Sequence, residues 1–337
     1  MSMKSGEFVL FIAGDNFSGT GPAIVTDALI KNAPKNTLYL KSVSKFLRAL
    51  EIPGKIMKCD AVLFSGFSKQ NIYGMNLCRL FHKKSAYLMH GCVEYENEMN
   101  RVPDKKMALL ERKMMKKTDL ILAVSRQFEE WLKEHYPEYR DKTEHLTNGI
   151  DWDLMQEKIS GEERDLHGII TVGGGMPRKG IVNICRAVEK LIDEGVSDIT
   201  LTVCGDEGAD TKEIDSYPFV KNEGLVSHER LMELYRKNRL FIQNSRFETF
   251  GLAPLEALLS QTEILISEKC GALSVIKSYE DSDIIRDTED IEEIAGKIKD
   301  LFLKENHVRL ICELDKESTS WQSRARQLLT IMKNLSH

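Results

Sequence analysis

The sequence predicts an α/β protein of two successive units, each a parallel sheet covered by helices. Short apolar runs of strand length alternate with longer amphipathic stretches along the whole chain, which is the pattern of α/β layers. This alternation stops in the polar stretch Asp151–His167 and then begins again. We therefore expect two facing α/β domains with a cleft between them, lined by the loops that follow the strands.

The first half contains apolar runs bounded by turn residues, each of strand length. The predicted strands are Phe8–Ala13, Thr37–Lys41, Ala61–Ser65, Ser85–Met89, Leu120–Val124 and Glu144–Leu146. Between them, apolar residues recur at helical spacing. The predicted helices are Pro22–Lys31, Ile72–His82, Lys105–Lys117 and Gln127–His135.

The second half repeats this alternation. The predicted strands are Ile169–Val172, Thr200–Cys204, Phe219–Glu223, Leu240–Gln243 and Glu263–Ile266. The predicted helices are Ile181–Glu194, Ser227–Lys237, Pro254–Leu259, Ile291–Phe302 and Thr319–Leu335. The last helix comes after the second unit is complete, so the expected parts are 1–160, 161–318 and a C-terminal helix over 319–337. A length of 337 residues fits two domains.

Charge is distributed unevenly along the chain. Residues 1–150 carry 23 Lys+Arg against 17 Asp+Glu, a net of +6, and the remaining residues carry 24 against 35, a net of −11. Much of the basic excess lies in Lys105–Lys117, where it alternates with Met and Leu. This stretch is either a solvated helix with its apolar stripe in the core or a helix resting on anionic lipid. No nucleic-acid partner is expected.

Several protein classes are excluded by composition. No apolar run approaches the roughly 18 residues of a membrane span, and Phe8–Ala13 is too short for a signal peptide. We expect a cytoplasmic protein. Its seven cysteines are scattered singly, which indicates neither a disulfide framework nor a zinc site.

The most informative segment is Ser245–Leu258. Pro254 suits the first turn of a helix, and the backbone N–H groups of Gly251–Leu255 then lie at an open helix N-terminus, where phosphate binds. Glu248 precedes this turn and Glu256 follows it. A carboxylate accepts two hydrogen bonds from a diol, so one suits a sugar and the other a ribose. Alternatively, Glu256 complements the helix dipole and Glu248 is a surface charge.

The Glu-x7-Glu spacing within E-T-F-G-L-A-P-L-E-A-L resembles the signature of retaining family 4 glycosyltransferases, which have the GT-B fold. Other landmarks occur in that family's order. These are T-N-G-I-D at 147–151, T-V-G-G-G-M-P-R-K-G at 171–180, L-T-V-C-G-D at 201–206 and E-G-L-V-S-H-E-R-L-M-E-L-Y at 223–235. The resemblance covers nearly all of residues 140–280 and, more loosely, the first half. It implies two facing Rossmann-like domains with a central cleft and a nucleotide-diphosphate sugar donor.

The resemblance also implies roles for individual residues. Arg178 and Lys179 match the basic pair that binds the donor diphosphate, where they would stabilise the leaving group. Glu248 would bind donor-sugar hydroxyls and Glu256 the ribose. The other residues expected to bind the donor are Gly173, Phe250, Gly251 and Leu252. Many members carry an additional Arg at the position of Gly174. Either Arg178 alone would do the work of both arginines, or phosphate binding would be weaker.

The first glycine-rich loop, Gly14–Pro22, follows a strand and opens a helix, so its N–H groups can approach phosphate or acceptor. It is neither G-x-G-x-x-G nor a P-loop, because Thr20 and not Lys follows Gly19. In the resembling family this loop faces the donor phosphates and the acceptor, with Gly19 and Gly21 as close-approach residues. His90 directly follows a strand. A lone histidine is more often structural, but the family places one here beside the donor sugar.

Two Asp-x-Asp patterns, Asp151–Asp153 and Asp281–Asp283, do not follow strands. We interpret both as turns and solvated charge, and we expect neither a metal nor a cofactor. If the resemblance holds, the acceptor hydroxyl attacks the front face and the product keeps the donor's anomeric configuration. The acceptor is expected to be a carbohydrate or lipid-linked glycan, with peripheral membrane association through the first domain and a role in polysaccharide biosynthesis. The alternatives are a nucleotide-sugar epimerase and a non-catalytic sugar-nucleotide-binding relative.

Overall fold

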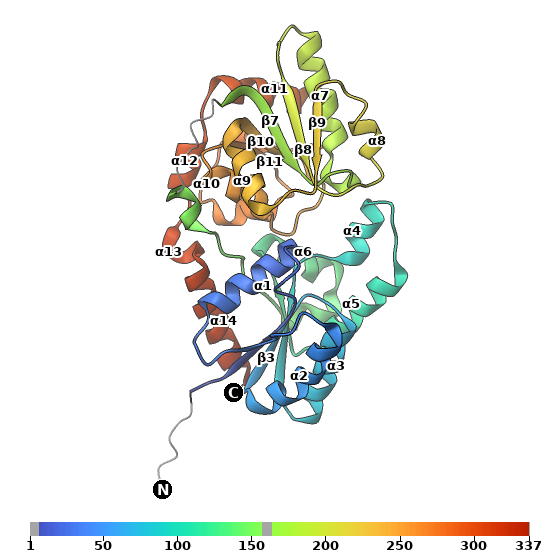
Figure 1. Ribbon diagram of the computed structural model, residues 1–337, viewed down its shortest axis with the longest axis vertical. Helices are drawn as coiled ribbons and strands as arrows, with labels where there is room; N and C mark the ends of the chain where they lie inside the picture. The colour runs from blue at the N-terminus through green and yellow to red at the C-terminus, as the bar shows by residue number, and fades with distance from the viewer. Residues whose placement is uncertain (1–6, 157–163, 337) are drawn as a thin grey trace. The chain divides into compact units, whose positions relative to one another are not determined.

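The fold is taken from a computed structural model, which describes residues 7–156 and 164–336. The chain forms two compact units (Figure 1). The first unit holds the residues up to Glu94, Asp104–Gly149 and the residues from Glu317 onward. The second unit holds Tyr95–Pro103 and Ile150–Lys316.

The segment Tyr95–Pro103 makes these units differ from the expected boundaries. The Tyr95 ring meets the Phe247 ring edge-on, with centroids 4.9 Å apart. Arg101 pairs with Asp210 at 3.3 Å, 109 positions away in the sequence. Local periodicity carries no information about partners so distant, so the assignment of Tyr95–Pro103 to the second unit could not be predicted from the sequence.

The first unit is built on a six-stranded parallel sheet in the order β2-β1-β3-β4-β5-β6. The strands are β1 (Leu10–Ala13), β2 (Leu38–Tyr39), β3 (Ala61–Ser65), β4 (Lys84–Met89), β5 (Leu120–Ala123) and β6 (Thr143–His145). The central strands β1, β3 and β5 are buried at every position, as expected for a sheet covered on both faces. All six lie within a few residues of their predicted positions.

Helices cover both faces of this sheet. They are α1 (Gly21–Asn32), α2 (Lys45–Lys58), α3 (Lys69–Leu80), α5 (Lys105–Lys117), α6 (Arg126–His135) and α14 (Trp321–Ser336). The short helix α4 (Val93–Met99) begins in the first unit and continues into the segment that belongs to the second. No helix was predicted over α2, whose Pro53 and Gly54 are residue types typical of turns. In the structure the helix is continuous, and Ile52 and Ile56 are buried on one face of it. The short α4 was not predicted either.

The C-terminal helix α14 belongs to the first unit, where it packs against α1 and β3 (Figure 1). Ala325, Leu328 and Met332 form its buried stripe. Its first residue, Trp321, lies so close to Gly149 that a Cβ at Gly149 would stand 2.5 Å from the indole. Glycine is therefore required where the chain leaves the first unit.

The second unit repeats the architecture with the order β12-β11-β10-β7-β8-β9, again all parallel. The strands are β7 (Asp165–Val172), β8 (Thr200–Cys204), β9 (Val220–Gly224), β10 (Asn238–Gln243), β11 (Glu263–Ser267) and β12 (Ile284–Ile285). The sequence analysis did not anticipate β12, which is only two residues long. An aliphatic core lies between this sheet and the helices on one face.

The helices of the second unit are α7 (Ile181–Asp193), α8 (Thr211–Ile214), α9 (His228–Lys237), α10 (Leu252–Leu259), α11 (Ile291–Leu303), α12 (His307–Cys312) and α13 (Lys316–Thr319), the last ending in the first unit. Asp283 corrects one expectation. It is buried, both of its carboxylate oxygens accept from Arg309 Nη2, at 2.8 and 2.9 Å, and Oδ1 also accepts from Asn306 at 2.9 Å. It is a structural anchor and not solvated charge.

Each sheet has one point at which the strand order reverses. In the first unit this point lies between β1 and β3, and in the second it lies between β7 and β10. The loops that leave two such strands run in opposite directions and open a crevice at the carboxyl edge of the sheet, where ligands of open α/β sheets bind. The two reversal points are therefore the candidate ligand sites of the two units.

Candidate functional site

The loop after β7 is shaped by consecutive glycines. Gly173 has a φ of 147°, and a Cβ there would collide with the stem of Lys179, which crosses directly over it. Gly180 has a φ of 60° and would place a Cβ 2.5 Å from the carbonyl of Asn244 in the loop after β10. The two loops at the reversal point are thus pressed together, and glycine allows this close approach.

Gly174 cannot carry the additional arginine that the resemblance suggested. Its φ is 53°, and a Cβ would collide with the carbonyl oxygen of Asp206. The N–H groups of Gly173 and Gly174 both donate to the carbonyl of Cys204, at 2.8 and 3.0 Å. The loop after β7 is therefore sealed against the loop after β8, and no side chain fits between them.

Lys179 and Glu248 form an ion pair at this crevice, both side chains being 13% exposed or less. Lys179 follows β7 and Glu248 follows β10. Gln243, the last residue of β10, donates from Nε2 to the same Oε2 of Glu248 at 3.1 Å. The structure thus brings together two of the predicted residues and adds Gln243, which the sequence analysis took for an ordinary strand residue.

Arg178 lies in the same cluster. Its Nη1 donates to the carbonyl of Phe247 at 3.1 Å and lies 3.7 Å from Glu248 Oε2. Its Nη2 lies 3.5 Å from Glu96 Oε2, and its backbone N–H donates to Asn100 at 3.2 Å. The Nε of Arg178 is buried and has no hydrogen-bond acceptor among residues 7–156 and 164–336. This guanidinium therefore retains a donor for a ligand.

Glu248 is held as a carboxylate. Burial, the largest influence, favours its protonated form, but the charges of Lys179 and Arg178 and the Lys179 hydrogen bond outweigh burial, so the pKa of Glu248 lies below its usual value. The backbone fixes its position, because Glu248 N–H donates to Lys269 at 3.2 Å and its carbonyl accepts from Gly271 at 2.9 Å. An ionised, immobile carboxylate is a hydrogen-bond acceptor and a poor acid.

The helix α10 begins beside Glu248. Its N-cap is Gly251, which has a φ of 86° and no side chain to cap the helix. A Cβ at Gly251 would stand 2.9 Å from Cys270 Sγ and 3.1 Å from Glu248 Cγ. The first backbone N–H groups of α10, those of Leu252 and Ala253, therefore stay uncapped by a side chain, as an anion-binding helix end requires. Phe250 is buried next to them.

Glu256 lies on α10 and pairs with His228 at the start of α9, with Nε2 and Oε1 3.4 Å apart. The hydrogen bond to Glu256, together with the charges of Glu256, Glu229 and Asp151, raises the pKa of His228 above its usual value despite burial. Sequence reasoning missed His228, which it read as the start of a helix. Only its place one residue after the cap Ser227 could have indicated a role.

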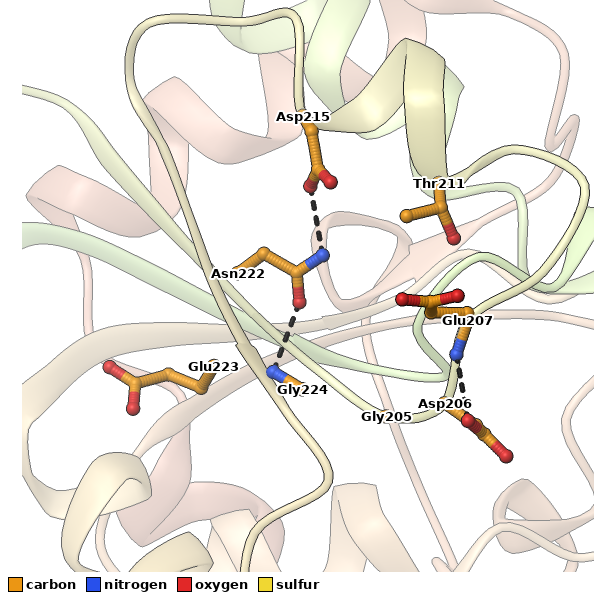
Figure 2. A pocket seen from close by; sticks show the side chains of 8 residues that line it. All are labelled: Gly205, Asp206, Glu207, Thr211, Asp215, Asn222, Glu223 and Gly224. Atoms are coloured by element: carbon orange, nitrogen blue, oxygen red, sulfur yellow. Dashed lines mark hydrogen bonds between the residues drawn. The ribbon is translucent and has the colours of Figure 1, made fainter.

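A separate hollow of about 350 Å³ lies beyond the ends of β8 and β9 (Figure 2). Four of its lining side chains are acids, Asp206, Glu207, Asp215 and Glu223. Asn222 points toward Asp215 and donates to it at 2.8 Å. None of the predicted site residues lines this hollow, and its carboxylates disfavour a diphosphate.

In the first unit, His90 follows β4 and its Nε2 lies 2.8 Å from Ser65 Oγ at the end of β3. Ser65 Oγ is in turn 2.7 Å from Thr26 Oγ1, which donates to the carbonyl of Pro22. Burial lowers the pKa of His90 to about 4, so the imidazole is neutral at pH 7. The site at this reversal point is a chain of neutral hydrogen-bonding groups.

The glycine-rich loop of the first unit is open. A Cβ at Gly19 or at Gly21 would meet no atom within 4 Å, although Gly19 has a φ of 70°. Packing of the described residues therefore does not require glycine at Gly21. The loop is held at Asp15, which pairs with Arg48 of α2 at 3.0 Å.

No group of three or more His, Cys, Asp or Glu side chains in the described part of the chain is arranged to hold a metal ion. No helix within 7–156 or 164–336 is long and apolar enough to cross a membrane. The seven cysteines are thiols, six of them buried and Cys312 exposed.

Comparison with solved structures places this architecture in the GT-B class, as the sequence predicted. The Anabaena protein HepE, solved with UDP and glucose, is 12% identical with a TM-score of 0.73, over 97% of this chain and 100% of that chain. The sucrose-phosphate synthase of Thermosynechococcus elongatus is 15% identical with a TM-score of 0.67, over 97% and 99%. At such identities the likeness shows the fold alone.

Sequence comparison then defines the family. The model of glycosyl transferases group 1 matches residues 155–327, more than half of the chain, and that of glycosyltransferase family 4 matches residues 14–154. The chain belongs to the group 1 glycosyltransferases.

Two curated relatives match more distantly. An uncharacterized glycosyltransferase of Methanocaldococcus jannaschii is 25% identical over 172 residues, which are 47% of this chain and 44% of the relative. A probable sucrose-phosphate synthase of Thermosipho melanesiensis is 24% identical over 241 residues, which are 66% of this chain and 56% of the relative. The chain thus spans about half the length of the curated relatives it matches.

Proposed function

We propose that this protein transfers a sugar from a nucleotide-diphosphate sugar to an acceptor hydroxyl, with retention of the donor's anomeric configuration. The observation that carries the proposal is the cluster of Lys179, Arg178 and Glu248 at the reversal point of the second sheet. Two cations and a fixed carboxylate, brought together from the loops after β7 and β10, match the charges of a diphosphate and the hydroxyls of a sugar.

The cations would act on the leaving group. A departing nucleoside diphosphate gains negative charge in the transition state, and preorganised donors in a water-poor site stabilise such charge. Arg178 retains a buried Nε donor, and the uncapped start of α10 offers the N–H groups of Leu252 and Ala253. Glu248 would orient the sugar by accepting from its hydroxyls, and Glu256 would bind the ribose. His90 would contact the sugar as a neutral donor or acceptor.

We propose that the reaction requires no metal ion and no cofactor. Arg178 and Lys179 would supply the positive charge that other glycosyltransferases obtain from a divalent metal bound to the diphosphate. A chelator should therefore leave turnover unchanged, and stimulation by magnesium or manganese would contradict this part of the proposal.

The paired state of Glu248 disfavours an epimerase. An epimerase needs a carboxyl group that gives and takes a proton, which is efficient when its pKa lies near the working pH. The pKa of Glu248 is lowered by its two cations. Conversion of donor without acceptor into a second nucleotide sugar would nevertheless identify an epimerase directly.

UDP is the first donor nucleotide to test, because HepE was solved with UDP and glucose and a trehalose-phosphate synthase of similar fold is UDP-forming. The acceptor we propose is a carbohydrate or a lipid-linked glycan used in polysaccharide biosynthesis, with the protein associating peripherally with a membrane.

Thermal unfolding with UDP, GDP, ADP and their sugars tests the donor site, since a ligand of the folded state raises the melting temperature. One nucleotide should raise it selectively in the wild type and not in Glu248→Gln or Lys179→Met. Turnover with that donor and a panel of acceptors follows, and the anomeric configuration of the product is read by NMR. A wild type that no nucleotide stabilises and that turns over no donor would refute the function.

A further inference from the structure

The outward face of α2 is apolar, although α2 lies on the surface of the first unit (Figure 1). Phe46 is 72% exposed, Leu50 63%, Leu47 49% and Met57 58%. These positions share one side of the helix, because a spacing of three, four, seven or eleven residues returns to the same face. A surface helix of a soluble domain normally presents polar side chains on that side.

The buried residues on the inner face of α2 fix the orientation of the helix and so keep its outer apolar side chains exposed. Ile52 and Ile56 are fully buried against the unit, and Arg48 is 9% exposed, with Nε donating to Ser42 at 2.7 Å. The helix therefore cannot rotate to bury Phe46 and Leu50 without exposing its present core residues. Apolar side chains lie on both the inner and the outer side of α2, and the described part of the chain buries only those on the inner side.

Neighbouring segments expose further apolar side chains. Val43, in the loop that leads into the helix, is 69% exposed. The helix α3 packs against α2 and exposes Tyr73 and Leu80. Large apolar side chains gathered on one exposed helix face, as on α2, mark a site of interaction with a protein or a membrane.

The charge around this surface selects the membrane. Lys41 and Lys58, at the two ends of the surface, and Lys69 at the start of α3 are exposed. Glu51, the acid of α2, is directed inward, where it pairs with Lys55 at 2.9 Å and accepts from the N–H groups of Lys41 and Ser42. Apolar side chains that enter the acyl boundary, with exposed lysines near both ends of the helix, fit a surface of anionic phospholipid.

We propose that α2, with Val43, docks the protein on an anionic membrane through Phe46, Leu47, Leu50 and Met57. This names a different helix from the basic stretch Lys105–Lys117, because α5 buries Met114 and Met115 and exposes only two large apolar side chains, Met107 and Leu109. Arg48 on the inner face of α2 holds Asp15 of the glycine-rich loop. The helix that docks thus also contacts the loop that is expected to meet a lipid-linked acceptor.

The proposal extends the proposed membrane association, and its test does not depend on the donor chemistry. The full chain is floated with vesicles of phosphatidylglycerol and phosphatidylcholine, and with phosphatidylcholine alone. The wild type should float with the anionic vesicles and much less with the neutral ones. Removing two inserted side chains in F46S/L50S should lower the vesicle partition coefficient by about a hundredfold, roughly tenfold for each side chain.

Two matched variants keep the test specific. L303S/V308S removes two exposed apolar residues of the second unit, 80% and 60% exposed, and should leave vesicle binding unchanged. M107S/L109S on α5 should reduce it less than threefold. A larger loss from M107S/L109S than from F46S/L50S would overturn the assignment to α2.

Folding and the competing occupant are checked separately. The melting temperature of F46S/L50S and its response to the stabilising nucleotide should match the wild type, because exposed side chains contribute little to stability. Failure of the wild type to float would overturn the membrane proposal and leave the donor proposal standing. So would a wild-type dimer that F46S/L50S dissociates in sedimentation velocity, because the surface would then be an interface between copies.

Discussion

The two reversal points of the sheets occupy the same place in the same architecture, yet their loops and side chains differ in packing and charge. At β7 and β10, glycines press the loops against each other and against the loop after β8, and the side chains are charged. At β1 and β3, the glycine-rich loop is open and the side chains are the neutral chain of His90, Ser65 and Thr26. Topology therefore selects where a site forms, and residue chemistry selects what it can hold.

This contrast explains the division of labour that we propose. A diphosphate needs fixed positive charge and N–H donors, which the second unit supplies. An acceptor hydroxyl needs neutral partners and room, which under this proposal the first unit would supply. The predictions below test the contrast in order of expected effect.

The largest effect is expected from Lys179→Ala. Loss of a cation that stabilises the leaving diphosphate should reduce kcat/KM about a hundredfold or more. The variant also leaves Glu248 buried with Arg178, 3.7 Å away, as its remaining cation, which should lower the melting temperature. Steady-state turnover with the donor chosen by thermal unfolding measures the first effect.

Lys190→Ala is the matched control, since Lys190 is a lysine of α7 that pairs with Glu194 and Glu292 away from the crevice. Its kcat/KM should stay within about twofold of the wild type. If the kcat/KM of Lys179→Ala were within threefold of the wild type, the charged site of the second unit would not be the site of the leaving diphosphate.

Gly174→Ala should destabilise the second unit by about 3 kcal/mol. The new Cβ would collide with the Asp206 carbonyl, and the residue would keep a left-handed φ. Gly195→Ala separates these causes. Gly195 also has a left-handed φ, of 92°, but open space around its Cβ position, so this variant should lose only about 1 kcal/mol. Urea unfolding measures both.

Equal losses in the two variants would mean that the loop after β7 yields to a methyl group. In that case the absence of an arginine at Gly174 would need an explanation other than packing. The loops of the second unit would then not be as tightly packed as the contrast with the first unit requires.

The pH dependence of stability should differ between the two sites. For His90, the folded pKa of about 4 lies below the ordinary value of 6.5, so the unfolded state binds more protons between these values. Stability is full above about pH 6.5 and falls as the pH drops toward 4, by about 2 kcal/mol for this half-buried group. His90→Asn should remove this part of the dependence in urea unfolding between pH 7 and pH 4.

Glu248 should act in a lower window. Its folded pKa is depressed below 4.5, so its contribution is present above 4.5 and is lost as the pH falls below that value. Wild type and Glu248→Gln should therefore diverge least near pH 4 and below. Identical pH profiles for wild type and His90→Asn would show that the histidine is not held neutral.

Much of this fold could be read from local patterns, and the failures are instructive. Strands such as Ala61–Ser65 are continuous apolar runs, because both faces of the sheet are covered. The helix α2 was not predicted. Its proline and glycine are residue types typical of turns, while the burial of Ile52 and Ile56 that overrides them is tertiary. The two-residue β12 is too short to carry any periodicity.

The site divides in the same way. Arg178, Lys179 and Glu248 could be predicted as site residues because they lie in sequence motifs of recognisable spacing. The structure places them together. Gln243 and the Glu96 and Asn100 contacts to Arg178 depend on segments folding back on one another. The roles assigned to Glu256, His90, Gly19 and Gly21 stay predictions.

The smallest effect is expected from Gly21→Ala. Gly21 is the first residue of α1, and a Cβ there meets no atom within 4 Å. The substitution should change the free energy of unfolding by less than about 1 kcal/mol, and could stabilise the helix, because alanine loses less entropy on folding. The variant distinguishes a glycine that the fold requires from a glycine that a bound ligand requires.

If Gly21 serves only the fold, both stability and turnover of Gly21→Ala will match the wild type. If instead the loop backbone must lie against a ligand, turnover will fall several-fold while the urea midpoint stays unchanged, because the new methyl group occupies space that only a bound donor or acceptor would fill. In that outcome the open loop of the first unit and the sealed loop of the second use glycine for the same purpose, close approach, with a ligand replacing the Asp206 backbone as the neighbour.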